Sequence, residues 1–420
     1  MADIGDNSFI NENDKFVKYK YVLEEFFVLI NGETMEIPKE RIYTINIEHD
    51  FENSMFPIFE VGVALEGSRY YKIVKNKSDV RFKVRIQTYY TEKDGGEKSL
   101  MRDFINDTFI MFLEDSADDA DEDLKKKYDI PNEDELDKSD NMMEFFLFKE
   151  SIITGLRQSI NYVFSSADLT TVIVALLQIA KGKNILMSPL ENTEVYKDLI
   201  LPPQPIDKQL RYLNNNYGFH KEGTLIYFGL YHGYILNYKA GCTAWTDGEW
   251  KETVIYVFEK SSELSGLSNV ILKYNEERYY FTVQADKIEI DAHSISNSLV
   301  SGGGSTLSVL DTRMQTAETF NSGATTQEGE TSSIIFNNTS NKYMGSTYAA
   351  QKRSSNIVIT LTLVNTNIEG LNPNKEFSII FENTAHNDKY KGKYRIASAK
   401  HNISLGNNDT ESEIVFKKVG

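Results

Sequence analysis

The sequence predicts an α+β protein that is mainly β. Two similar small antiparallel β-barrel domains are expected to flank a central α/β domain, and a Ser/Thr/Gly-rich insertion is also expected. Aromatic residues form 12% of the 420 residues, and such residues are favoured in strands and large interfaces. Apolar and polar residues alternate strictly over 80–87, as in a half-buried strand. Two capped, amphipathic helices are expected between residues 165 and 218.

Length, charge and cysteine content limit the possible classes. A chain of 420 residues is expected to hold about three domains. The single cysteine, Cys242, excludes an internal disulfide framework. The formal charge of −17 argues against conventional nucleic-acid binding, which depends on clustered Lys and Arg. Since no signal-peptide pattern and no long apolar run is present, we expect synthesis in a cytoplasm without membrane insertion.

The first predicted barrel spans 16–113 and follows a polar N-terminal extension at 1–15. Asn31-Gly32 is a strong hairpin signal between two apolar runs. Residues 43–48 and 80–87 alternate between apolar and polar side chains, and 56–65 and 70–74 are expected to be further strands. These short strands with turn signals between them favour a small, closed or nearly closed antiparallel barrel.

Residues 114–140 form an acidic linker or insertion. The segment holds thirteen acidic residues and four lysines, a net charge of −9, so the rest of the chain carries −17 − (−9) = −8. Asp119, Asp121 and Asp123 have the spacing of the first ligands of a calcium loop. However, Leu124 stands where that loop needs glycine and Ile130 where it needs glutamate, which favours a solvated segment.

The central α/β domain is expected over 141–240. In 165–168 a hydroxyl and a carboxylate can cap a helix, whose apolar face continues to Gly182. Pro205 suits a helix start and Gly218 a helix end, with apolar residues at helical spacing between them. Short strands are expected at 184–189 and 224–231. The predicted order is therefore helix, strand, loop, helix, strand.

The C-terminal part is predicted to return to β structure. Residues 241–300 form a β-rich segment, and 356–420 form the second barrel portion, whose strand spacing is similar to that of 43–90. Between them, 301–355 is rich in Ser, Thr, Gly and Asn and is expected to be a loop region. This region is either flexible or ordered against a partner.

No catalytic, cofactor-binding or metal-binding residue is predicted. The six histidines are scattered and no zinc motif is present. A Cys242–His232 pair has no nucleophile context, and 302–304 lacks the lysine of a phosphate loop. Glu24-Glu25 could serve glycoside hydrolysis, but a chain with 62 carboxylates offers many accidental pairs. The glycosylation triplets carry no meaning without a secretory route; they begin at Asn106, Asn338, Asn402 and Asn408.

Four segments of the central region carry a family resemblance. They are Ile185-Leu-Met-Ser-Pro189, 196–203, 206–213 and 217–229. Together they resemble the central domain of baseplate hub proteins of contractile-tailed bacteriophages. The resemblance is strongest over 165–238, weaker over 41–112, and limited to strand order over 355–418. The acidic insertion, the polar start and the Ser/Thr/Gly-rich segment depart from the family pattern.

The resemblance implies a structural protein without turnover. It implies a homotrimer whose two barrel domains per subunit alternate in a pseudo-sixfold ring, which joins the sixfold tail tube to the central spike. The implied partners are the tail tube protein, the spike and the baseplate wedge proteins, with phage DNA only in transit. The implied location is the tail baseplate of the virion. We further expect carboxylates to line the channel, because a basic wall would retain DNA.

Two other functions stay open from the sequence. A tail-associated cell-wall hydrolase is the enzymatic alternative, although no nucleophile or metal motif favours it. A baseplate or receptor-binding module is the second alternative. Solution mass separates them, because a hub is expected to be trimeric.

Overall fold

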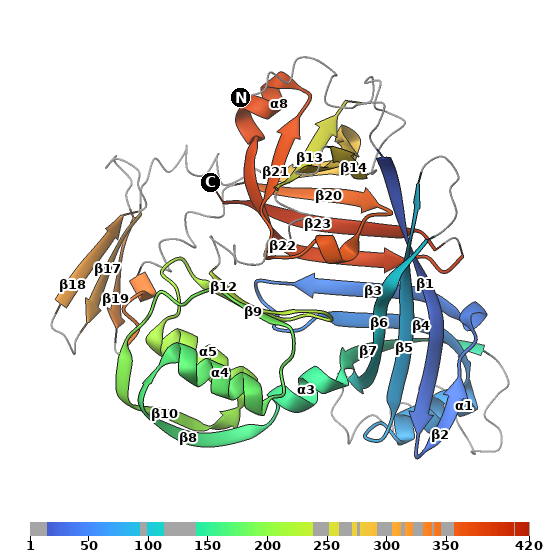
Figure 1. Cartoon of the computed structure of the whole chain (residues 1–420), viewed down its shortest axis with the longest axis horizontal. Helices are drawn as coiled ribbons and strands as arrows, with labels where there is room; N and C mark the ends of the chain where they lie inside the picture. The colour runs from blue at the N-terminus through green and yellow to red at the C-terminus, as the bar shows by residue number, and fades with distance from the viewer. Residues whose placement is uncertain are drawn as a thin grey trace.

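The computed structural model places two β halves side by side, with a smaller α/β domain against them (Figure 1). The structure describes residues 15–92, 99–112, 140–237, 252–259, 271–274, 278–291, 305–311, 316–321, 331–337, 340–345, 357–406 and 408–419.

Among the residues that the structure describes, the first β half contains seven strands and one α-helix. The strands are β1 (Lys15–Ile30), β2 (Glu33–Glu36), β3 (Ile42–Asp50), β4 (Ile58–Glu66), β5 (Arg81–Glu92), β6 (Ser99–Phe112) and β7 (Asp140–Lys149), and the helix is α1 (Gly67–Lys75). The order β1-β5-β6-β7-β4-β3 is antiparallel throughout, with β2 paired to β1. Side chains from these strands form one buried core.

The hairpin and strand patterns of this half are confirmed. Asn31 and Gly32 adopt φ of 51° and 83°, as a two-residue hairpin turn between β1 and β2 requires. Phe82, Val84 and Ile86 on β5 are fully buried, as their alternation predicts. The prediction of a strand over 70–74 is wrong, because this stretch lies in helix α1.

In the described part of the second β half there are eight strands and helix α8 (Thr384–Tyr390). The strands are β13 (Glu252–Phe258), β14 (Ile271–Tyr274), β15 (Arg278–Gln284), β16 (Ile288–Asp291), β20 (Val358–Val364), β21 (Phe377–Phe381), β22 (Gly392–Ile403) and β23 (Thr410–Lys418). Their order is β16-β20-β23-β22-β21-β13-β15-β14, around a second core.

Two features of the second half differ from the sequence-based expectation. Strand β13 runs parallel to both β15 and β21, so this half is mixed rather than purely antiparallel. The strands of 252–291 pair with those of 357–418 in one sheet, although the sequence predicts two separate segments there. The pairing is long-range, and spacing along the sequence carries no information about it.

The central domain contains helices α3 (Glu150–Leu156), α4 (Leu169–Ile179) and α5 (Ile206–Tyr217). Its strands form a β8–β10 ribbon and a three-stranded sheet; they are β8 (Ser159–Asp168), β9 (Ile185–Met187), β10 (Val195–Pro205), β11 (Thr224–Phe228) and β12 (Gly233–Asn237). Both predicted helices and the strands at 185–187 and 224–228 are present. The connection expected as a loop before α5 instead contains β10.

Two segment boundaries also differ from the expectation. The region assigned to the central domain began at residue 141, but β7 pairs with β4 and β6 of the first half. Within the range expected as a loop, β17 (Ser305–Asp311), β18 (Thr316–Asn321) and β19 (Thr331–Asn337) form a separate three-stranded sheet. Polar composition argued against a large core there, but backbone pairing between three strands does not require one.

Helix α4 begins at the carboxylate of Asp168, whereas the hydroxyl of Ser165, expected to cap the helix with it, lies in β8 and donates to Asp198. The Asp168 side chain accepts a hydrogen bond from the Thr171 amide at 2.7 Å, and this bond holds the pKa of Asp168 below its usual range. The helix then buries Leu169, Val172 and Leu176 against the central core. A local signal in the sequence therefore determines where this helix starts.

Replacing Asp168 by alanine is expected to lower the free energy of unfolding by about 0.5–2 kcal/mol, because the first free amides of α4 lose their acceptor. Urea titration followed by circular dichroism measures the change. Asp168→Asn is the control, since its amide oxygen can still accept the bond and most of the stability should remain. An equal loss in both variants would show that the cap hydrogen bond is not responsible.

Candidate functional site: the seam between the two sheet halves

The two β halves meet along a seam formed by two strand pairings. Residues 45–50 of β3 pair antiparallel with 398–403 of β22, and 15–17 of β1 pair with 271–273 of β14. Because β22 also pairs with β21 and β23, the fifteen strands form one continuous sheet. The halves are therefore adjacent in space, although the central domain separates them in sequence.

Buried aromatic and polar groups lie at this seam. His49 Nδ1 is 2.7 Å from Tyr227 Oη of β11, and His401 Nδ1 is 2.8 Å from Ser412 Oγ of β23. The two imidazole rings are 5.6 Å apart, edge to face, and Phe51 stacks on His49 at 5.4 Å. These contacts join the first half, the second half and the central domain at one point.

Burial keeps both histidines neutral. It lowers the pKa of His49 from 6.5 to about 4, and lowers that of His401 well below its usual value, with the neighbouring His49 as a further cause. His49 is half-buried as a residue, and its ring contacts those of Phe51, Tyr227 and His401. The pair therefore packs as neutral aromatic groups at neutral pH, and a proton added there would be destabilising.

A second contact at the seam centres on Tyr21 of β1, which is fully buried. Its hydroxyl accepts a hydrogen bond from the Ile368 amide at 2.8 Å and lies 3.4 Å from the Thr366 carbonyl oxygen. The amide of Tyr19 donates to the Asn365 carbonyl at 3.0 Å. The loop after β20 is thereby fixed to the first half.

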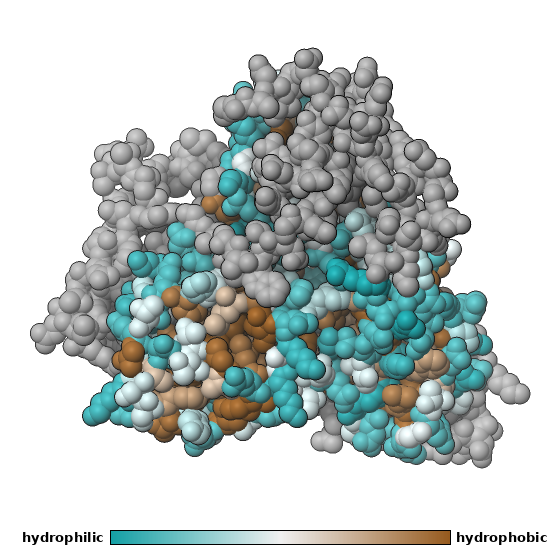
Figure 2. All heavy atoms as spheres, viewed as in Figure 1, coloured by the Kyte–Doolittle hydropathy of each residue, from teal (hydrophilic) through white to brown (hydrophobic). Residues whose placement is uncertain are grey.

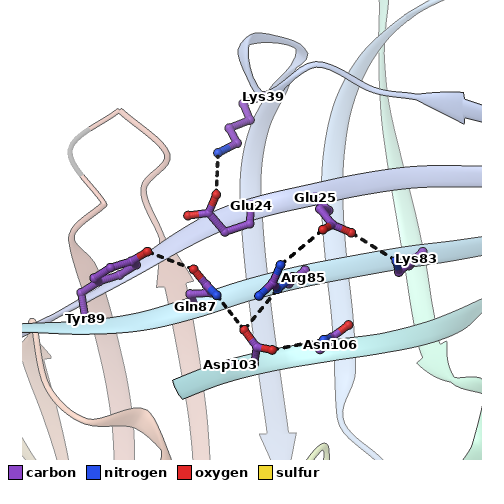
Figure 3. A network of polar contacts seen from close by, with 9 residues as sticks. All are labelled: Glu24, Glu25, Lys39, Lys83, Arg85, Gln87, Tyr89, Asp103 and Asn106. Carbon is purple, nitrogen blue, oxygen red and sulfur yellow. Dashed lines mark hydrogen bonds and ion pairs between the residues drawn. The ribbon is translucent and has the colours of Figure 1, made fainter. Parts of the chain in front are cut away.

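A network of charged side chains covers the outer face of β1, β5 and β6 (Figure 3). Arg85 lies between Glu25 and Asp103, at 3.4 Å and 3.2 Å, and Lys83 is 3.2 Å from Glu25. Gln87 donates to Asp103 at 2.8 Å. Positive and negative groups alternate across the strands, so this face is close to neutral and its carboxylates are matched to donors.

The glutamate pair considered for glycoside hydrolysis belongs to this region. Glu24 is 3.6 Å from Lys39, while Glu25 contacts Lys83 and Arg85. Lys83, followed by Arg85, lowers the pKa of the Glu25 carboxyl. A general acid needs a raised pKa, so the environment of Glu25 is opposite to that requirement.

The other sequence candidates are not brought together by the described residues. His232 precedes β12 and its ring lies 6.3 Å from that of Tyr234. Its proposed partner Cys242, the calcium-like Asp119, Asp121 and Asp123, and the glycines of 302–304 lie outside the described residues.

Two further properties concern the described ranges alone. Over these ranges, no group of three or more His, Cys, Asp or Glu side chains has the proximity that a metal ion needs. None of the helices in that part of the chain has the length and apolarity to span a membrane.

Residues 341–343 form a strap on the end of α5 that sequence patterns did not indicate. Asn341 Nδ2 donates to the carbonyls of Asn214 and Asn215 at 3.3 Å and 3.1 Å, and Lys342 is 2.8 Å from Glu194. Tyr343 is buried and donates to the Glu191 carbonyl at 3.0 Å. The strap fixes the segment after β19 to the central domain.

Gly218 is where the strap approaches the backbone most closely. Its φ is +72°, and a Cβ there would lie 2.2 Å from Asn341 Oδ1. Gly218→Ala is therefore expected to lower the free energy of unfolding by about 1–3 kcal/mol, through backbone strain and displacement of the strap. Urea denaturation measures it. Gly406→Ala is the control, because nothing lies within 4 Å of its added Cβ; equal losses in the two variants would contradict this account.

Comparison with solved structures finds similar chains at low sequence identity. The tail protein from Neisseria meningitidis MC58 is 11% identical, with a TM-score of 0.49, over 95% of this chain and 97% of that one. The 43 kDa tail protein of prophage MuSo2 from Shewanella oneidensis is 11% identical, with a TM-score of 0.49, over 94% of this chain and 97% of that one. A chain of the half-lidded Francisella PdpA-VgrG complex is 9% identical, with a TM-score of 0.50, over 97% of this chain and 58% of that one.

Comparison of sequences identifies the family. None of the curated proteins compared with the chain matches it. A family model described as the bacteriophage PBS1 gene 109 protein matches residues 7–419, which is nearly the whole chain. The chain therefore belongs to the bacteriophage PBS1 gene 109 protein family.

Proposed function

We propose that this chain is a structural baseplate hub of a phage tail. Three copies form a pseudo-sixfold ring that joins the tail tube to the central spike and lets DNA pass. The partners of the ring are the tail tube protein, the spike and the baseplate wedge proteins. The chain acts by its shape in the virion and has no catalytic turnover.

The observation that carries the proposal is the pairing of β3 with β22. It holds two β halves with separate cores side by side in one subunit, so three subunits present six such halves. In the proposal each half closes into a barrel in the ring. Membership of a phage protein family and the fold similarity to a chain of the Francisella complex support this assignment.

The seam chemistry also supports a structural role. At neutral pH the two seam histidines are neutral and packed, and they are hydrogen-bonded to Tyr227 and Ser412. Such contacts hold the two β halves and the central domain in a fixed arrangement. Carboxylates on the channel wall remain part of the proposal, since they would keep DNA sliding.

Sedimentation equilibrium of the purified protein, alone and with the spike protein, tests the proposal. A mass of three chains, alone or on addition of the spike, is the expected result. A monomer under both conditions that binds host cells would instead favour a receptor-binding module. Clearing of peptidoglycan in a zymogram would favour the cell-wall hydrolase.

A further inference from the structure

The two β halves are separate packing units that meet along the seam. Each half buries a core formed mostly by its own strands, and its strand path is continuous without the other half. Six residue pairs between β3 and β22 and three between β1 and β14 join them. Figure 1 shows β3 and β22 side by side at the boundary. Separation of β3 from β22 would therefore leave most of both cores in place.

The point where β3 meets β22 holds a histidine with one unpaired ring nitrogen. His401 is fully buried and its Nδ1 is 2.8 Å from Ser412 Oγ, whereas its Nε2 has no hydrogen-bond partner among the described residues. The His49 ring lies 5.6 Å away, and its Nδ1 is 2.7 Å from Tyr227 Oη. A protonated imidazole has two N–H donors, and a buried N–H without an acceptor is unfavourable. The site therefore accommodates the neutral form of His401 and disfavours the charged form.

Ionisable groups surround this histidine pair on several strands. On β3, β11, β22 and β23 they are Glu48, Asp50, Tyr227, Lys400, Glu413 and Lys417, with Glu52 just after β3 and Tyr234 on β12. Glu48, Lys400 and Glu413 directly precede or follow the inward-facing residues of their strands, so their side chains point to the opposite face of the sheet. Tyr227 and Tyr234 are buried, and burial raises the pKa of both hydroxyls, so they stay neutral. None of these five groups supplies a negative charge on the buried side.

The remaining carboxylates at this point already have partners. Asp50 accepts hydrogen bonds from the amides of Glu52 and Asn53, and Glu52 pairs with Lys417. Over the described part of the chain, no carboxylate pairs with either histidine ring. A proton on one ring would therefore add an uncompensated positive charge, and a second proton would add repulsion between the two rings.

We infer that the His49–His401 pair is an acid-sensitive latch: a proton on either ring releases β3 from β22 while both cores stay folded. Release exposes the rings to water, which solvates an imidazolium, so protons favour the released state. The second contact across the seam contains no histidine, because there the Tyr21 hydroxyl is hydrogen-bonded to Ile368 and Thr366. That contact keeps the halves joined when the latch opens. The inference concerns the seam of one chain and does not rest on the trimeric ring.

Amide exchange is the measurement that reports opening at this place. Apolar side chains are already exposed over the central domain (Figure 2), among them Val174 and Ile179, so a dye for apolar surface would also bind the closed chain. Amide exchange instead reports each segment separately. The test compares the wild-type chain at pH 7.5 and pH 5, after correction for the direct effect of pH on exchange. Both values lie above the ordinary pKa of Asp and Glu side chains.

We expect amide protection to fall at the seam. Burial lowers the pKa of His49 to about 4, and the released ring regains 6.5, so opening is favoured as the pH falls below 6.5. Between pH 7.5 and 5 this difference multiplies the opening constant by about 25, and His401 acts in the same direction. The seam-facing amides of 45–50 and 398–403 should therefore lose protection by at least about 25-fold.

The two cores and two variants are the controls. Amides of 82–86 and 359–363, one strand in each core, should keep their protection at pH 5. The double variant His49→Gln/His401→Gln has no titrating group in the latch, so its seam should lose much less protection between the two pH values, whatever its protection at pH 7.5. His386→Gln, exposed on α8, should behave as the wild type.

A loss confined to the seam of the wild type, and reduced in the double variant, supports the latch. Equal loss at the seam and in both cores would show global unfolding, and unchanged protection at the seam would show that the pair tolerates a proton; either result overturns the inference. So does a seam loss that persists in the double variant, because it assigns the acid response to other groups. If the double variant does not fold, the single variant His49→Gln decides in the same way. Sedimentation at neutral pH, which tests the trimer, is independent of these outcomes.

Discussion

Replacing Leu176 by alanine is expected to lower the free energy of unfolding by about 2–5 kcal/mol, the largest effect of a single substitution considered for this protein. Leu176 is fully buried on α4, in the core that joins α4, α5 and the ribbon. Truncation leaves a cavity, and α4 cannot readily move to fill it because β8 and β9 fix its two ends. Urea denaturation followed by circular dichroism measures the loss.

Ile179→Ala on the same helix is the matched control. Ile179 is 41% exposed, so its truncation removes little buried surface and should change the free energy of unfolding of the isolated chain by less than about 1 kcal/mol. Similar losses in the two variants would show that α4 is not anchored by the face assigned here.

Acidification is expected to weaken the seam between pH 6.5 and 4. Burial lowers the pKa of His49 from 6.5 in the unfolded chain to about 4 in the folded chain, and shifts that of His401 in the same direction. The unfolded state therefore binds more protons in this window. The contribution of the neutral histidines to the free energy of unfolding is fully present above pH 6.5 and is lost as the pH falls toward 4. For His49 this loss is about 3 kcal/mol. Denaturation midpoints at half-unit pH intervals measure it.

Two variants separate the seam from general acid effects. His49→Gln can still hydrogen-bond Tyr227 but no longer titrates, so its stability should depend less steeply on pH across the window. His386→Gln removes an exposed histidine on α8 and should leave the slope unchanged. A slope in His49→Gln equal to that of the wild type would contradict the assignment of acid sensitivity to the seam.

The local features of this fold could be predicted from the sequence. Asn31-Gly32 determines a turn, Asp168 caps α4, Gly218 ends α5, and the alternation of 82–86 identifies a half-buried strand. Each of these signals depends on residues within one turn of a helix or a few residues of a strand, which is why a single sequence reveals them.

The features that depend on long-range pairing could not be predicted. The pairing of β3 with β22 joins residues about 350 positions apart, and the strap places Asn341 on α5 across more than 120 positions. His49 and His401 looked like scattered histidines, because their proximity exists only once the two halves meet. The helix at 67–75 was missed because Tyr70 to Val74 also has the composition of a strand.

Electron microscopy of the purified protein tests the central claim most directly. If this chain is monomeric alone, the spike protein is added to the sample. Class averages are expected to show a ring with threefold symmetry, six similar lobes around it and an open centre. Particles that contain one or two chains, or a threefold particle without a central opening, would contradict the proposal that this chain forms a hollow tail hub.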